Sequence, residues 1–122
     1  TLTFNGGLVV ASGTTAPEEG FDCDQNTFAI RGGTLVGTGG ASSSPTAANC
    51  TQRAVLYKAA GTSGSMTMLF SLPALTNATY AIVTNAAVSG GTEFHGVYVG
   101  ATVTGGTTSK TFTASSMVTT VQ

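Results

Sequence analysis

Charged and aromatic residues are scarce in this sequence. Lysine and arginine total 4 and aspartate and glutamate total 5 among 122 residues, so charged residues make up 7% of the chain, against about 25% in ordinary soluble domains. The net charge of −1 gives no electrostatic basis for binding nucleic acid or an anionic membrane. Trp is absent, and no apolar run approaches the ~20 residues of a membrane-spanning helix. We therefore expect no nucleic-acid partner and no membrane span.

Residues that carry catalysis are equally scarce. His95 is the single histidine, and Glu93 lies two residues before it, so the two side chains share one face of an alternating strand. No serine elbow, zinc-binding spacing or HExxH motif accompanies them, and the paired carboxylates of a glycosidase are not evident. The sequence therefore argues against an enzyme, and it favours a surface or edge-strand histidine.

The residues that are abundant are small and hydroxylated. Gly occurs 17 times, and hydrophobic residues reach 41%, mostly as Val, Ala and Leu. Such a chain can bury a core and is not a disordered segment. Its length is that of one domain or a part of one. A polar surface made of hydroxyls and amides is typical of secreted and cell-surface β-proteins, so we expect an extracellular or cell-surface location.

Two stretches, 1–13 and 26–40, repeat one pattern at an offset of 26 residues. The repeat aligns Leu2 with Phe28, Phe4 with Ile30, the pair Gly6-Gly7 with Gly32-Gly33, and Val9 with Leu35. Apolar and polar residues alternate before each glycine pair, which predicts a strand, and a second short strand follows the pair. A repeat of this length is typical of solenoids.

The repeat predicts an all-β protein. Residues 1–57 are expected to form rungs of a parallel β-helix, each made of a strand, a glycine corner and a second strand, with inward side chains stacked from rung to rung. The alternative is a pair of similar hairpins in a β-sandwich. Residues 58–122 are expected to form a small antiparallel sheet that caps or extends the rungs, with strands at 66–72, 79–84, 94–103, 110–113 and 117–121.

The first predicted strand begins at the first residue, Thr1. A solenoid that begins on a bare strand has an open end. We therefore expect a longer or processed precursor, or another chain that covers this end.

Two cysteines, Cys23 and Cys50, lie 27 residues apart, close to the repeat offset. Stacking of the rungs would bring them together, and in an extracellular chain an even count favours a disulfide. The alternative is two free thiols that pack as small hydrophobic side chains. Asn49 and Asn77 each begin an Asn-x-Thr sequon in a predicted loop and are candidate glycosylation sites.

The loop after the first rung is acidic. Asp22, Asp24 and Asn26 place oxygen ligands at every second residue, and Glu18 or Glu19 could add a carboxylate. Calcium binds six to eight oxygen ligands of these kinds, so this loop is a candidate calcium site. The alternative is a solvated acidic turn or an Asx-turn.

Five segments together carry a family resemblance: the rung residues 5–13 and 30–37, the loop Gly20-Phe21-Asp22-Cys23-Asp24, the segment from Ser43-Ser44-Pro45 to 52–56, and the tail 111–121. Through them, most of the chain resembles the C-terminal part of a bacterial, secreted carbohydrate-binding β-helix family first described in cellulolytic clostridia. It implies a secreted, right-handed parallel β-helix that binds acidic or cellulosic polysaccharides and holds calcium. Two departures are the absence of the family's N-terminal rungs and Cys23, which stands where the family usually has a small residue.

Two functions follow as expectations. The first is non-enzymatic polysaccharide binding, in which Tyr57, Tyr80 or Tyr98 could stack on sugars, although tyrosine in a strand more often packs internally. The second is a structural subunit of an extracellular filament or surface layer, a homopolymer assembled head-to-tail by β-strand addition. In that case Leu2 and Phe4 are buried beside Phe28 and Ile30, and the assembly edge comprises Leu2, Phe4, Met117 and Val121.

Overall fold

The computed structural model describes residues 1–13, 20–39, 43–58, 67–94 and 96–122. Within these ranges the protein is all-β, as predicted, and its single helical element is the short 3-10 helix η1 (Ala47–Asn49). The chain forms two compact units, residues 1–78 with 114–122 (unit 1) and residues 79–113 (unit 2). The sequence led us to expect a division at residue 57, whereas the strand at 67–71 and the last strand both belong to the sheet of unit 1.

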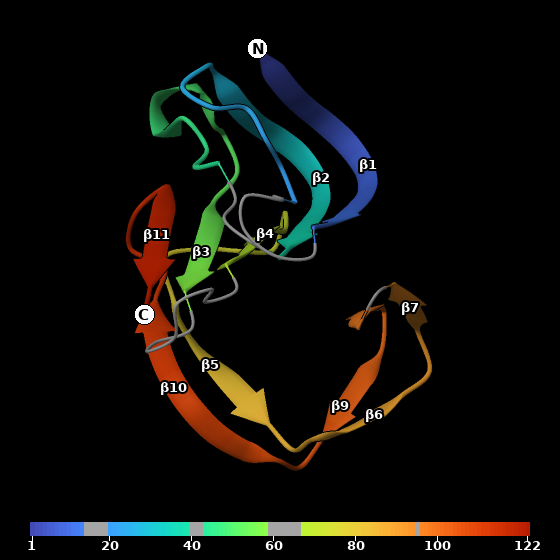
Figure 1. Cartoon of the computed structure of the whole chain (residues 1–122). Coiled ribbons are helices and arrows are strands. Elements are labelled where there is room, and N and C mark those ends of the chain that lie inside the picture. The colour runs from blue at the N-terminus through green and yellow to red at the C-terminus, as the bar shows by residue number, and fades with distance from the viewer. Residues whose placement is uncertain (14–19, 40–42, 59–66, 95) are drawn as a thin grey trace. The chain divides into compact units, whose positions relative to one another are not determined.

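Unit 1 contains one five-stranded sheet, in the order β1-β2-β4-β3-β11 (Figure 1). Its strands are β1 (Leu2–Ser12), β2 (Phe28–Thr38), β3 (Ala54–Lys58), β4 (Thr67–Ser71) and β11 (Val118–Val121). The two copies of the repeat, β1 and β2, pair in parallel, with Leu2 opposite Phe28, Phe4 opposite Ile30 and Val9 opposite Leu35. The predicted pairing of the two copies is therefore confirmed on both sides of the glycine pairs, but the register shifts at the corner, where Asn5 lies opposite Gly32.

The third strand does not continue this stack. β4 lies between β2 and β3 and is antiparallel to both, so a parallel β-helix is not shown. The last strand also differs from the expectation of an antiparallel C-terminal sheet, because β11 pairs in parallel with β3. Alternation identified both segments as strands, but the neighbour of a strand depends on contacts that are distant in sequence.

The glycine pairs form the corners of the two stacked strands. Gly33 has a φ of +90°, a conformation that L-residues with side chains rarely adopt. A Cβ at Gly33 would also lie 2.8 Å from the carbonyl carbon of Gly6 in the neighbouring strand. The close approach of the two corners therefore requires glycine.

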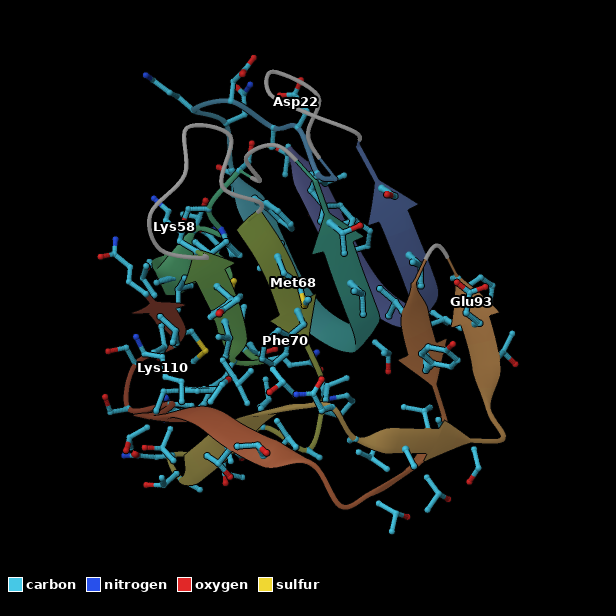
Figure 2. The ribbon with its side chains drawn as sticks, turned by 60° about the horizontal axis from the view of Figure 1, so that its bottom comes forward. Asp22, Lys58, Met68, Phe70, Glu93 and Lys110 are labelled. Carbon is cyan, nitrogen blue, oxygen red and sulfur yellow. The ribbon has the colours of Figure 1, made fainter. Side chains whose placement is uncertain are left out.

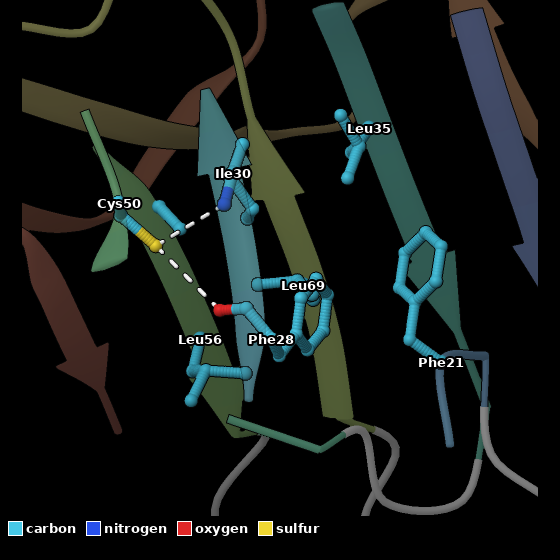
Figure 3. Close-up of a cluster of buried hydrophobic side chains, with 8 residues drawn as sticks. Phe21, Phe28, Ile30, Leu35, Cys50, Leu56 and Leu69 are labelled. Atoms are coloured by element: carbon cyan, nitrogen blue, oxygen red, sulfur yellow. Dashed lines mark hydrogen bonds between the residues drawn. The ribbon is translucent and has the colours of Figure 1, made fainter. Parts of the chain in front are cut away.

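The core of unit 1 lies on one face of this sheet. Phe28, Ile30, Leu35 and Leu69 are fully buried there (Figure 3). Full burial of an apolar side chain of this size stabilises a protein by about 1.5–3 kcal/mol, so these residues account for much of the stability of the unit.

A buried polar network fixes the position of β4. The side-chain amide of Gln52 donates to the carbonyl of Gly33 and to the hydroxyl of Ser71, each at 2.8 Å. The Ser71 hydroxyl in turn donates to the carbonyl of Arg53 at 2.6 Å. Ser71 is fully buried, so its hydroxyl has no water to bond to. These hydrogen bonds replace the ones to water that the polar groups lose on burial. The network joins the corner of β2, strand β4 and the start of β3.

Unit 2 is a long antiparallel hairpin, whose two arms pair with each other in three successive segments. Three antiparallel pairs follow one another along it, β5 with β10, β6 with β9, and β7 with β8. Their bounds are Thr79–Thr84, Ala87–Ser89, Thr92–Phe94, Val97–Val99, Thr102–Thr104 and Thr107–Thr113, for β5 to β10 in order. The ring of Tyr80 packs 5.8 Å from that of Phe112 across the first pair.

Candidate functional site

The candidate site is the free edge of β1, which is the side of residues 2–12 that faces away from β2. Among the described residues, β1 pairs with β2 alone and so forms one outer edge of the sheet in unit 1 (Figure 1). It is 11 residues long and contains no charged residue and no proline. Charges and prolines are the usual devices that prevent an edge strand from pairing with another chain. The free edge of β1 has neither.

Backbone groups point outward along this edge. The Leu2 N–H donates to the Thr27 carbonyl, and the Gly13 N–H donates to the Thr38 carbonyl, both at 2.8 Å and both towards β2. Because backbone direction alternates along a strand, the N–H groups of Thr3 and Val10 point away from β2. These groups would pair with an added strand.

The apolar core extends to this edge, where its side chains are only partly buried. Phe28, Ile30 and Leu35 of β2 are all 0% exposed, whereas their partners in β1, at positions 2, 4 and 9, are only partly buried against the same core. The ring of Phe4 lies 5.5 Å from Phe21 and 5.8 Å from Phe28, between ring centroids. The prediction that residues 2 and 4 face inward beside the second copy is confirmed, but their burial is incomplete.

The far edge of the same sheet is β11. Among the described residues it pairs with β3 alone, and its Val121 is buried while Met117, just before the strand, packs against the core. The guanidinium of Arg53 donates to the Ala114 carbonyl at 3.0 Å, which fixes the segment that leads into β11. The four residues predicted to form the assembly edge therefore belong to two opposite edges, Leu2 and Phe4 on one and Met117 and Val121 on the other.

The predicted calcium ligands lie on a turn and not on an extended corner. Asp24 has a φ of +47°, and the Asn26 N–H donates to the Cys23 carbonyl at 3.0 Å. This reversal removes the regular alternation on which the calcium prediction depended. Asp22 is exposed in the same loop (Figure 2), and Glu18 and Glu19 lie outside the described residues. No three His, Cys, Asp or Glu side chains in the described ranges are grouped to hold a metal.

The predicted disulfide is not formed, because Cys23 and Cys50 are free thiols. The Cys50 sulfur accepts from the Ile30 N–H at 3.3 Å and contacts the Phe28 carbonyl at 3.8 Å (Figure 3). The Cys23 thiol instead donates to the Thr27 carbonyl at 3.5 Å. Each sulfur thus has its own backbone partners, and both pack in the core as small hydrophobic groups.

Both predicted glycosylation sites are exposed outside the strands. Asn49 ends the 3-10 helix η1, and its carbonyl accepts from the Arg31 guanidinium at 3.4 Å. Asn77 lies in the connection before β5. Glycosylation of either residue stays a prediction.

The hairpin at the tip of unit 2 exposes an aromatic ring. Tyr98 is 52% exposed and lies directly opposite Glu93 in the β7–β8 pair, so the two side chains share one face. The Glu93 carboxylate accepts a hydrogen bond from the Gly96 N–H, and His95 lies outside the described residues. The sequence placed Tyr98 in a strand, but only the structure distinguishes it from the packed Tyr80 and the partly buried Tyr57.

Comparison of the chain with protein-family models, with curated proteins and with solved structures gave no match. Within the described part of the chain, no helix has the length and apolar character required to cross a membrane.

Proposed function

We propose that this chain is a structural β-protein of an extracellular filament or surface layer, and that its copies assemble by strand addition at the free edge of β1. The observation that carries the proposal is the contrast in burial between aligned residues of the repeat. Phe28, Ile30 and Leu35 are fully buried, whereas Leu2, Phe4 and Val9 are not. An added strand would bury the second set as β1 buries the first.

The energetics favour such an addition. Apolar area removed from water stabilises an association by about 25 cal/mol per Å², and the added strand would also pair outward backbone groups such as the Val10 N–H. No charge on β1 would have to be desolvated. When the β1 edge of one copy pairs with a different edge of the next copy, the contact does not close on itself, so it produces a fibre.

The test is an edge proline with two controls. In Val10→Pro the lost N–H points outward, so the substitution spares the β1–β2 ladder and blocks only an added strand. Val10→Thr keeps the N–H and should assemble as the unmodified chain does. Leu2→Pro removes the bond to Thr27 and should also destabilise the monomer.

Sedimentation velocity and electron microscopy of residues 1–122 would measure assembly, and circular dichroism would verify the fold. We expect filaments for the unmodified chain and Val10→Thr, and folded monomers for Val10→Pro. Filaments formed equally well by Val10→Pro, or a monomeric unmodified chain at high concentration, would contradict the proposal.

A second candidate function, polysaccharide binding, is favoured by Tyr98. Its half-exposed ring offers a face on which a sugar could stack, and the adjacent Glu93 could accept hydrogen bonds from sugar hydroxyls. Aromatic ring contacts contribute about 0.5–1.5 kcal/mol, so Tyr98→Ala should weaken binding to cellulose or pectate about two- to tenfold. Tyr98→Phe keeps the ring and should bind nearly as well, and equal binding by all three proteins would exclude Tyr98 as the site.

Calcium at Asp22, Asp24 and Asn26 is part of this second candidate. An ion bound only by the folded state raises the melting temperature by mass action. Calcium should then raise the melting temperature of the unmodified chain, and it should leave unchanged that of the double variant Asp22→Asn with Asp24→Asn. An unchanged melting curve of the unmodified chain in excess calcium and in excess chelator would exclude the site.

A further inference from the structure

We infer that the strand which covers the C-terminal part of β1 is β11 of a second copy, parallel to β1, with Val118 beside Val9, Thr119 beside Val10 and Thr120 beside Ala11. This inference rests on the proposed function and specifies its partner strand, direction and register. Three properties of the sheet in unit 1 lead to it.

The first property is direction. β1 is parallel to β2, β4 is antiparallel to β2 and to β3, and β3 is parallel to β11. The two edge strands, β1 and β11, therefore run in the same direction. A copy moved along the sheet, without being turned over, brings its β11 to the free edge of β1 as a parallel neighbour. The repeat itself uses this pairing between β1 and β2.

The second property is the alignment of residues across the sheet. The pairings define three rows that run from one edge to the other. The rows are Val9-Leu35-Ser71-Ala54-Val118, Val10-Val36-Phe70-Val55-Thr119 and Ala11-Gly37-Leu69-Leu56-Thr120. Continuing each row into the next copy gives the proposed register. In the first row, Val118 of one copy would then lie beside Val9 of the next. Each of these side chains already packs against the core of its own copy.

The third property is the direction of the backbone groups. The Ala54 N–H donates to the Met117 carbonyl at 2.9 Å, so Val118 and Thr120, which alternate with Met117 and Thr119, point their backbone groups away from β3. A residue in a parallel pair bonds to the two residues that flank its row partner.

Val10 points its N–H and carbonyl outward from β1. In the proposed register its N–H meets the Val118 carbonyl, and its carbonyl meets the Thr120 N–H. A slip of one residue would break this match and would turn the side chains to the wrong faces. The backbone groups of the two edges therefore agree with the register that the rows define.

The composition of the two edges is also compatible with pairing, because neither β1 nor β11 contains a charged residue.

The five strands of unit 1 at a strand spacing of about 4.8 Å predict an axial repeat of about 24 Å for each copy. An isologous pairing of two β1 strands is the competing arrangement. It would be antiparallel and would close as a dimer.

The experiment is cysteine cross-linking in assembled residues 1–122. In the variant Val10→Cys with Thr119→Cys, the two engineered residues would be row partners across the interface, at a Cα separation of about 4.8 Å that a disulfide can bridge. The matched control is Leu8→Cys with Thr119→Cys. Its thiols lie on the same face but two residues out of register, about 8 Å apart, which is too far for a disulfide. Peptide mass spectrometry identifies the linked residues and separates them from Cys23 and Cys50.

We expect mild oxidation to give a ladder of covalent oligomers linked through positions 10 and 119, and no ladder from the control. Filaments that yield no link between these positions, or dimers of the single variant Val10→Cys linked through position 10, would overturn the inference and leave strand addition at β1 standing. Failure of every variant and of the unmodified chain to assemble would overturn the proposed function and this inference together.

Discussion

The hydroxyl of Thr38 donates to the hydroxyl of Ser12 at 3.1 Å, between residues that stand 26 positions apart in the sequence. This separation is the offset of the repeat, and the two residues are partners in the β1–β2 pairing. Thr38 is buried, whereas Ser12 is exposed on the outer strand. Hydroxyl contacts thus stack from one copy of the repeat to the next, as the apolar side chains do, and both stop at the free edge of β1.

The Ser12–Thr38 bond should be measurable as a coupling energy. A hydrogen bond of this kind contributes about 1 kcal/mol net, so Thr38→Val and Ser12→Ala should each lower the free energy of unfolding. Because both remove the same bond, the double variant should lose about 0.5–1 kcal/mol less than the sum of the single losses. Urea unfolding of the four proteins at a concentration where they are monomeric measures this, and strictly additive losses would show that the bond contributes nothing.

Phe28 and Phe4 should differ in their contributions to monomer stability. Phe28 is fully buried, so Phe28→Ala should cost about 3–5 kcal/mol. Phe4 is only partly buried, and Phe4→Ala should cost at least about 1 kcal/mol less in the monomer, because less apolar area returns to water. Chemical denaturation below the assembly concentration checks the order, and an equal or larger loss for Phe4→Ala would mean that the edge is already complete in the monomer.

The amide of Gln52 should be required for the position of β4. Gln52→Leu leaves the Gly33 carbonyl without its donor and removes a partner of Ser71, at a cost of about 1–3 kcal/mol. Gln25 lies exposed in the loop before β2, so Gln25→Leu is a matched control that should change stability by less than about 0.5 kcal/mol. Equal unfolding midpoints in urea for the two variants would remove Gln52 from this role.

Cys23 and Cys50 should behave as free thiols of unequal accessibility. Cys50 is buried and Cys23 is partly buried, so an alkylating reagent should modify Cys23 first in the native protein and both residues after unfolding. Mass spectrometry follows the reaction without reductant. Alkylation that occurs only after reduction would instead establish a disulfide between them.

The sequence was sufficient to predict the features that depend on local alternation and on the repeat. The pairing of Leu2 with Phe28 and of Phe4 with Ile30 follows from aligning the apolar residues of the two copies at the offset of the repeat. The register shift at the corner, which places Asn5 opposite Gly32, does not follow from that alignment. The insertion of β4 between β2 and β3 could not be predicted in this way, since it depends on the contacts of Gln52 and Ser71, which are 19 residues apart.

The candidate site was predicted in part for the same reason. The exposed edge of β1 could be predicted from the repeat. That β1 and β11 run in the same direction is known only from the full strand order of the sheet. The calcium prediction assumed an extended chain through Asp22, Asp24 and Asn26. The left-handed conformation of Asp24 is a single-residue property that alternation of polar residues does not reveal.

The most direct test of strand addition at β1 is amide hydrogen exchange at Val10 and Ala11, compared between monomer and assembly. The Ala11 N–H points towards β2 and should exchange slowly in both states. The Val10 N–H points to the free edge, so it should exchange rapidly in the monomer and become protected on assembly, when it pairs with an added strand. Rapid exchange of Val10 in assembled material, with Ala11 still protected, would contradict strand addition at this edge.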